Sequence, residues 1–197
     1  MTVPTGAYSK KSHKKSKWKH DEKLVASLTF ALNGFGRVID IGAGAGNYVK
    51  ALRDIGFDVI GVDGTEGIEA LTSGLVHQCE LTDSNSPETI LNSYGTFGAA
   101  ICIEVGEHIP AGFVDVFVDN ICRLPERRLV VSWAIPGQKG RGHVSCRTAA
   151  WVATQIEKRS FAYNEEATLG ARDEAAKLGR IGKSKSRNLL VFDKIGT

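Results

Sequence analysis

The sequence predicts an α/β fold, a Rossmann-like doubly wound sheet of seven strands, mostly parallel with an antiparallel last strand. Three observations predict it. Short apolar runs alternate with helical segments along most of the chain, as in parallel strands joined by helices. A glycine-rich turn follows the first apolar run. The chain then closes on strand, polar segment and strand, which indicates a final antiparallel strand at or near the sheet edge.

The expected strands are the apolar runs at residues 37–42, 57–63, 75–80, 97–104, 127–134, 161–164 and 188–195. Each has about the length of a buried strand. The expected helices lie at residues 22–33, 47–56, 65–74, 87–94, 111–124 and 148–160, and residues 165–179 form a helix or a lid. Their apolar residues recur at helical spacing, as Val49, Leu52 and Ile55 do.

The chain divides into a basic N-terminal arm, residues 1–21, and one domain, residues 22–197. A length of 197 residues allows a single domain with a substantial core. Between Lys10 and Lys23, seven lysines and two histidines stand against two acidic residues, and the remainder of the chain is slightly acidic. Such a run contacts nucleic acid, serves as a localisation tag, or is simply solvated.

The composition predicts a soluble, cytoplasmic protein with no membrane segment. No apolar run reaches the roughly 20 residues that a membrane span needs. The lysine-rich N-terminus lacks the apolar core of a secretory signal. The four cysteines form no C-x-x-C pair, which suits reduced thiols in a reducing compartment.

The glycine turn after the first strand is the strongest single signal. VIDIGAGAG places Asp40 in the strand and Gly42, Gly44 and Gly46 before the following helix. Glycines let a ligand approach the main chain closely, and a helix N-terminus presents unpaired amide groups. Asp63 ends the next strand, where a carboxylate can bind both hydroxyls of a ribose. The alternative is a tight strand–helix connection without a ligand.

The charge of this turn distinguishes between nucleotide ligands. A carboxylate at Asp40 repels a pyrophosphate and attracts a cationic ligand. Asn47 stands where the NAD fingerprint has its third glycine. An NAD-dependent dehydrogenase is therefore disfavoured, and an adenosine that bears a sulfonium suits the turn.

Four stretches in this order, VIDIGAGAG, VIGVDG, CELTD and IEVGEHIP, resemble the class I S-adenosylmethionine-dependent methyltransferases. The resemblance covers nearly the whole chain after the arm and implies that S-adenosyl-L-methionine is the cofactor. The residues that it assigns to the cofactor are Asp40, Gly42, Gly44 and Gly46 for the methionine part, Asp63 for the ribose, Glu80 and Leu81 for the adenine, and Glu104 beside them. The family more often has Asp where this chain has Glu80, and often an acid where it has Gly98.

IEVGEHIP, residues 103–110, places two carboxylates and an imidazole directly after the fourth strand. This E-x-x-E-H stretch is similar to that of small-RNA 2′-O-methyltransferases and ubiquinone-pathway O-methyltransferases, in which it binds a divalent metal together with a later histidine. The resemblance implies a divalent-metal site whose ligands are Glu104, Glu107, His108 and His143. Two carboxylates and two imidazoles can hold Mg²⁺ or Mn²⁺, and they bind Zn²⁺ more tightly.

The same residues also allow other interpretations. Without a metal, His108 is a candidate general base, with Glu107 as a second catalytic residue. In the structural alternative, the acid caps the next helix and the histidine only packs. A zinc site with His143 and Cys146 lacks the paired spacing of such sites.

These patterns predict O-methylation of a hydroxyl on a small molecule or on RNA, with or without metal assistance. The residues expected at the acceptor are Trp133, Pro136, Gln138, Lys139 and Arg141 in the loop after the fifth strand, and His13, Trp18 and His20 in the arm. The alternative is a catalytically inactive nucleic-acid-binding protein that keeps the fold and binds through its lysines. The acceptor, and the choice between oxygen and nitrogen, remain open.

Overall fold

The computed structural model describes residues 21–180 and 184–196, so the predicted basic arm lies outside the described residues except for Asp21. Seven strands form one sheet in the order β3-β2-β1-β4-β5-β7-β6. The strands are β1 (Val38–Ile41), β2 (Val59–Asp63), β3 (Val76–Gln78), β4 (Phe97–Ile103), β5 (Pro125–Ser132), β6 (Phe161–Tyr163) and β7 (Leu190–Lys194). β1 to β5 pair in parallel, and β7 is antiparallel to both β5 and β6.

The predicted fold class is confirmed, including the position of the last strand. β7 is second from the edge, because β6 pairs on its outer side. The described helices are α2 (Glu22–Leu32), α3 (Asn47–Asp54), α4 (Ile68–Thr72), α5 (Ser86–Tyr94), α6 (Val114–Arg123), α7 (Ala149–Glu157) and α8 (Glu165–Lys177), with short 3₁₀ turns η1 (Gly106–His108), η2 (Ala111–Phe113) and η3 (Lys185–Asn188). Within the described ranges, no helix has the length and apolar character that crossing a membrane requires.

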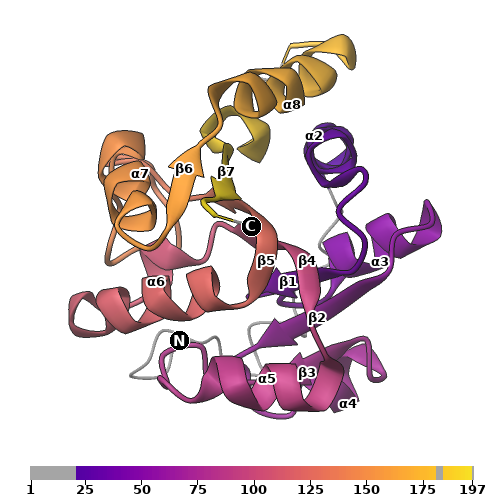
Figure 1. Cartoon of the computed structure of the whole chain (residues 1–197), viewed down its shortest axis with the longest axis vertical. Helices are drawn as coiled ribbons and strands as arrows, with labels where there is room; N and C mark the ends of the chain where they lie inside the picture. Colours follow the sequence, from indigo (N-terminus) through magenta and orange to yellow (C-terminus); the bar gives the residue numbers. More distant parts are fainter. Residues whose placement is uncertain (1–20, 181–183, 197) are drawn as a thin grey trace.

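Alternating side chains of the strands build two apolar cores, one on each face of the sheet. In β4, Ala100 and Cys102 face the core formed with α5, α6 and α7, whereas Ala99 and Ile101 face the core formed with α2, α3 and α8. Figure 1 shows the sheet between these two groups of helices. Burial on both faces is the reason that the strands read as continuous apolar runs.

The segment predicted as a helix or a lid, residues 165–179, is the helix α8, which packs against α2 (Figure 1). Asn164 caps its N-terminus, because the side-chain oxygen accepts a hydrogen bond from the amide of Ala167 at 2.8 Å. Ala171 and Ala175 are buried on its inner face. Their small side chains let the two helices approach closely.

Position 98 in β4 requires glycine, because another part of the backbone crosses the strand there. A Cβ atom at this position would overlap the carbonyl oxygen of Phe35. The Phe35 ring in turn lies under the guanidinium groups of Arg127 and Arg128, 4.9 and 4.1 Å from its centroid. The connection between α2 and β1 is thereby held against the sheet, which explains why this chain has no acidic side chain at position 98.

We predict that Gly98→Ala destabilises the fold by roughly 1–3 kcal/mol, because the backbone at Phe35 must move to admit the methyl group. The matched control is Gly112→Ala, where a Cβ atom meets nothing within 4 Å. Urea unfolding measures both variants. Equal unfolding midpoints for the two would contradict the explanation.

Candidate functional site

A cleft of about 420 Å³ opens at the carboxyl ends of the parallel strands. It is lined by the glycine turn after β1, by the end of β2, by the segment after β3 and by the loops after β4 and β5. The predicted site residues in its wall are Asp40, Gly42, Gly44, Asp63, Glu80, Leu81, Glu104, Glu107, His108 and His143. The predicted cofactor residues and the predicted metal ligands therefore line the same cavity.

Asp63 connects the glycine turn to the end of β2 through hydrogen bonds. One carboxylate oxygen, Oδ2, accepts a hydrogen bond from the amide of Gly44 at 2.9 Å, and Oδ1 accepts one from the amide of Thr65 at 2.9 Å. Gly44 has a φ of 54°, a left-handed conformation that glycine adopts without strain. The aspartate thus shapes the turn and also presents its carboxylate to the cleft.

Two glycines of the turn are needed for packing. A Cβ atom at Gly42 would overlap the Val105 side chain in the loop after β4. Gly46, with a φ of 75°, precedes α3, and a Cβ atom there would overlap Leu75 and Val76. Gly46 is the one predicted cofactor residue that does not line the cleft.

Asp40 is a buried carboxyl group at the floor of the cleft. Its side chain is 2% exposed, and its Oδ2 atom has no hydrogen-bond partner among the described residues. Burial, together with the nearby charge of Asp63, raises its pKa to about 7, whereas Lys185 opposes this shift. A cation bound beside it would favour the ionised form.

Glu80 and Leu81 follow β3 and enter the same wall. The Glu80 carboxylate accepts hydrogen bonds from the amide and the hydroxyl of Thr82 at 3.1 and 2.7 Å. The backbone oxygen of Leu81 accepts one from the Asn120 side chain at 3.0 Å. These bonds hold Glu80 and Leu81 in place, the two residues that the family resemblance assigns to the adenine.

Glu107 lies in η1 and is completely buried. Neither oxygen of its carboxylate makes a hydrogen bond of normal geometry with a described residue. Burial and the neighbouring Glu104 raise its pKa to about 8. The preceding Gly106 packs directly against the Trp133 ring, so the tryptophan limits how far this turn can extend into the protein interior. A buried carboxyl group without a hydrogen bond is uncommon in folded proteins, and it makes Glu107 a candidate ligand.

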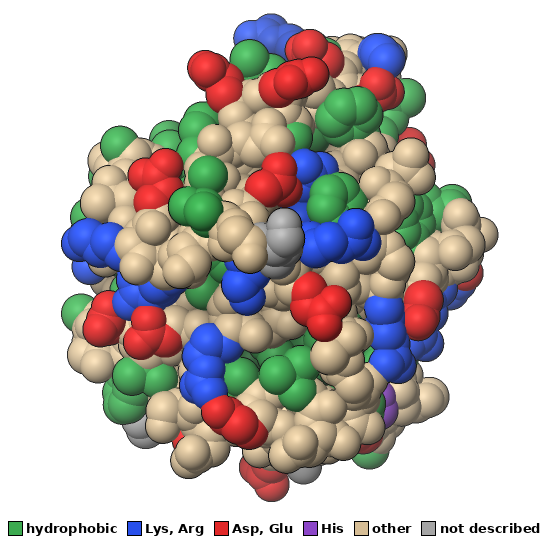
Figure 2. All heavy atoms as spheres, viewed as in Figure 1, with side chains coloured by type: hydrophobic (Ala, Val, Ile, Leu, Met, Phe, Trp, Pro, Cys, Tyr) green, Lys and Arg blue, Asp and Glu red, His purple; other side chains and the backbone are tan. Residues whose placement is uncertain are grey.

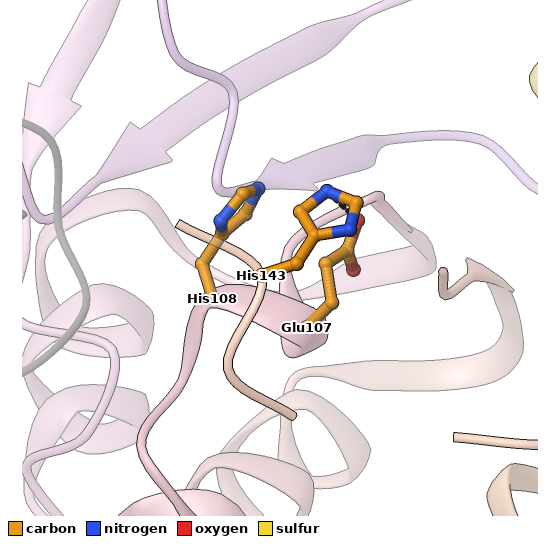
Figure 3. Close-up of side chains that lie close together, drawn as sticks. All are labelled: Glu107, His108 and His143. Atoms are coloured by element: carbon orange, nitrogen blue, oxygen red, sulfur yellow. Dashed lines mark ion pairs between the residues drawn. The ribbon is translucent and has the colours of Figure 1, made fainter. Parts of the chain in front are cut away.

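Two histidines complete a cluster with Glu107, as Figure 3 shows. The His108 Nδ1 atom lies 3.1 Å from the Gly142 oxygen, and the His143 Nδ1 atom lies 3.1 Å from the Gln138 oxygen. A carbonyl only accepts, so each Nδ1 carries the proton and each Nε2 carries the lone pair. The His143 Nε2 atom is 3.8 Å from Glu107 Oε1. One ligand atom from each of the three residues falls within 4.8 Å of the others.

Glu104 lines the cleft but is not part of this three-residue cluster. Its carboxylate accepts hydrogen bonds from the Ser132 hydroxyl at 3.1 Å and from the Gln138 side-chain amide at 2.8 Å. Its φ of 55° is left-handed, an unfavourable conformation for a residue with a side chain. Such strain is concentrated at functional sites.

Gln138 connects three parts of the site. Its amide nitrogen donates to Glu104, its side-chain oxygen accepts from Asn188 at 3.0 Å, and its backbone oxygen orients His143. From the sequence, Gln138 was expected only to contact the acceptor. Lys185 and Tyr48 also line the cleft, and no motif in the sequence marks either of them.

We predict that Asp40→Asn stabilises the free protein at pH 8. The folded-state pKa of about 7 exceeds the ordinary value of 3.8, so wild-type stability falls as the pH rises between these values. The variant lacks this penalty, which is on the order of 2–4 kcal/mol above pH 7. Urea unfolding at pH 5 and pH 8 measures it. A variant-minus-wild-type difference that is independent of pH would refute the burial argument.

Comparison with known proteins places this geometry in a family. A family model described as a methyltransferase domain matches residues 13–134, more than half of the chain. The ubiquinone biosynthesis O-methyltransferase of Colwellia psychrerythraea (strain 34H / ATCC BAA-681) is 34% identical over 86 residues, which cover 40% of this chain and 34% of that protein. The match thus spans about a third of that relative's length.

Solved structures share the fold at low sequence identity. The magnesium protoporphyrin IX methyltransferase of Synechocystis PCC 6803 with bound SAH has a TM-score of 0.61 and 17% identity, and the match covers 88% of this chain and 81% of that one. The sugar N-methyltransferase KedS8 from Streptoalloteichus sp ATCC 53650 has a TM-score of 0.62 and 14% identity, with 88% and 86% covered. The chain therefore belongs to the methyltransferase domain family, and it has the fold of these solved methyltransferase structures.

Proposed function

We propose that this chain transfers a methyl group from S-adenosylmethionine to a hydroxyl group of a small-molecule or RNA acceptor, with the help of a divalent metal ion. The observation that carries the proposal is the single cleft in which the glycine turn faces the Glu107, His108 and His143 cluster. One half of the cleft suits the methyl donor, and the other suits activation of the acceptor.

The donor half combines groups that suit a charged nucleoside. The Asp40 carboxyl group attracts the cationic end of the donor, which in turn favours its ionised form. Asp63 presents a carboxylate to ribose hydroxyls while it holds the amide of Gly44. Gly42 and Gly46 contribute the shape of the turn, and Glu80 with Leu81 border the adenine.

The residues of the other half fit a metal ion. One carboxylate oxygen of the buried Glu107 and one ring nitrogen of each histidine lie within 4.8 Å of one another. The Nδ1 atoms of both rings contact backbone carbonyls, so Nε2 is the nitrogen that each neutral ring would offer to a metal. Backbone carbonyls commonly orient metal-bound histidines in this way. The proposed ligands are Glu107, His108 and His143, with Glu104 as the fourth by its place in the E-x-x-E-H stretch. Mg²⁺ and Mn²⁺ suit the carboxylates, and two imidazoles bind Zn²⁺ more tightly.

The chemistry requires an acceptor oxygen without its proton. A bound metal would lower the pKa of the acceptor hydroxyl. With the metal held by His108, the acidified hydroxyl would lose its proton to water. In a cleft without metal, His108 can take that proton instead, because burial lowers the pKa of its imidazole and keeps it neutral near pH 7. The oxygen then forms a bond to the methyl carbon as the carbon–sulfur bond breaks, which releases S-adenosylhomocysteine. If no metal binds, His108 alone serves as the base.

An oxygen acceptor on a small molecule is favoured by the similarity to the ubiquinone biosynthesis O-methyltransferase. An RNA acceptor is favoured by the lysine-rich arm, which lies outside the described residues. The loop after β5 supplies Gln138, Lys139 and Arg141 to the cleft wall, where the acceptor must enter.

Donor binding is tested by isothermal titration with S-adenosylhomocysteine. We predict that Asp63→Ala weakens the affinity by about tenfold or more, because a charge-assisted contact and the anchor of the glycine turn are both lost. Asp58→Ala, at an exposed carboxylate that pairs with Arg37, is the matched control. Absence of S-adenosylmethionine and S-adenosylhomocysteine binding by the wild type would defeat the proposed function.

Metal binding is tested separately, by titrating EDTA-treated protein with Mn²⁺. We predict that Glu107→Gln and His143→Ala each weaken binding, while His77→Ala, which removes a histidine stacked on Tyr94, does not. Wild-type affinity should rise from pH 6 to pH 8, because the carboxyl group of Glu107, with its pKa of about 8, must lose its proton to bind.

The metal proposal also predicts that methyl transfer depends on a bound divalent metal ion. Turnover should fall after EDTA treatment and return with Mg²⁺ or Mn²⁺. Turnover that is unchanged by EDTA, together with no measurable Mn²⁺ binding, would leave His108 as a metal-free base and remove the metal from the proposal.

A further inference from the structure

We infer that the methyl acceptor carries an anionic group, a phosphate or a carboxylate, and that Lys185 binds this group in the cleft with Lys139 and Arg141. The inference rests on the proposed function, since it names the chemical class of the molecule that the transferase methylates. The three residues line the same cavity as the donor and metal residues, and no sequence motif marks Lys185.

The charges in the cleft are segregated by the elements that carry them. The acids of the donor half, Asp40, Asp63 and Glu80, come from β1, from β2 and from the segment after β3. The basic side chains come from elsewhere: Lys139 and Arg141 from the loop after β5, and Lys185 from η3. The other two acids of the cleft, Glu104 and Glu107, come from the segment after β4, so the cations alone occupy the segments after β5. An anion would be bound by direct contact with these cations.

Neither of the two ammonium groups is held in a close ion pair. Within the described residues, neither Lys139 nor Lys185 forms an ion pair, although the cleft also contains carboxyl groups. The charge of Lys185 acts on Asp40 and Glu107 without a direct ion pair to either. Both ammonium groups can therefore still form a direct contact with an external anion.

Lys185 is held in place by its backbone. Its amide donates to Asp21 Oδ2 at 3.2 Å, and the Ser184 hydroxyl donates to the same oxygen at 2.7 Å. The other Asp21 oxygen caps α2. The Lys185 ammonium lies 6.0 Å from the centroid of the Tyr48 ring, which also lines the cleft. The helix end thus fixes the segment that carries the cation.

The position of Lys185 relates the anion to the reaction. Lys185 lines the same cleft as Asp40 of the donor half and His108 of the acceptor half. An anion bound there would leave the reacting hydroxyl of the same molecule a few bonds away, within reach of His108. We therefore expect a small acidic acceptor or a phosphate-bearing terminus.

The surroundings are consistent with this assignment. Asp21, the first described residue, is bonded to the Lys185 segment, so the six lysines between Lys10 and Lys19 precede a residue beside the cationic side of the cleft. On the face shown in Figure 2, basic and acidic side chains are interspersed, without one extended basic surface. Cleft residues, not that face, supply the clustered positive charge.

The test uses the full chain saturated with S-adenosylhomocysteine and titrated with inorganic phosphate or, in a second arm, with acetate. We expect wild type to bind at least one anion and Lys185→Gln to weaken that binding by about tenfold or more. Lys177→Gln, at an exposed lysine paired with Glu174, should behave as wild type. The anion that binds more tightly distinguishes a phosphate from a carboxylate acceptor.

The outcomes separate this inference from the proposed function. If wild type binds S-adenosylhomocysteine but neither anion, or if Lys185→Gln binds both anions as wild type does, the inference is overturned and the proposed function stands. The same holds if Lys185→Gln loses affinity for S-adenosylhomocysteine, since Lys185 would then belong to the donor site. If wild type does not bind S-adenosylhomocysteine, the proposed function fails and this inference fails with it.

Discussion

The contact between Gly42 and Val105 joins the two halves of the cleft. Gly42 belongs to the turn after β1, and Val105 to the loop after β4, the strand next to β1. Because a side chain at position 42 would overlap Val105, only glycine lets the loop lie directly against the turn. The same loop continues into Glu107 and His108, so this contact positions the Glu107 cluster relative to the glycine turn.

Several residues around this contact have features that lower the stability of the free protein. Asp40 and Glu107 are buried acids with raised pKa values and unpaired oxygens, and Glu104 has a left-handed backbone conformation. None of these features favours folding of the free protein. Two packed cores of apolar side chains on both sides of the sheet support them. A bound cation on either side of the cleft would relieve the burial of charge.

Hydrogen bonds to Gln138 and Asp21 extend this arrangement to parts of the chain far apart in sequence. Gln138 holds Glu104, Asn188 and the ring of His143 in one network. Asp21 ties the start of α2 to the turn that carries Lys185. The C-terminal segment therefore contributes to the cleft, although the motifs of the site all lie before it. Several hydrogen bonds, instead of one, therefore connect the cleft to segments far apart in sequence.

The sequence by itself determined the fold class, the glycine turn with Asp63 and the E-x-x-E-H stretch. Helical and strand periodicity, and the spacing of glycines and acids within one strand–turn–helix unit, are local properties that a linear pattern retains. Only the tertiary structure decided that His143 lies beside Glu107, that the Gln138 side chain donates a hydrogen bond to Glu104, and that Lys185 lines the cleft. These depend on contacts between distant segments and on burial, which no short stretch of sequence specifies.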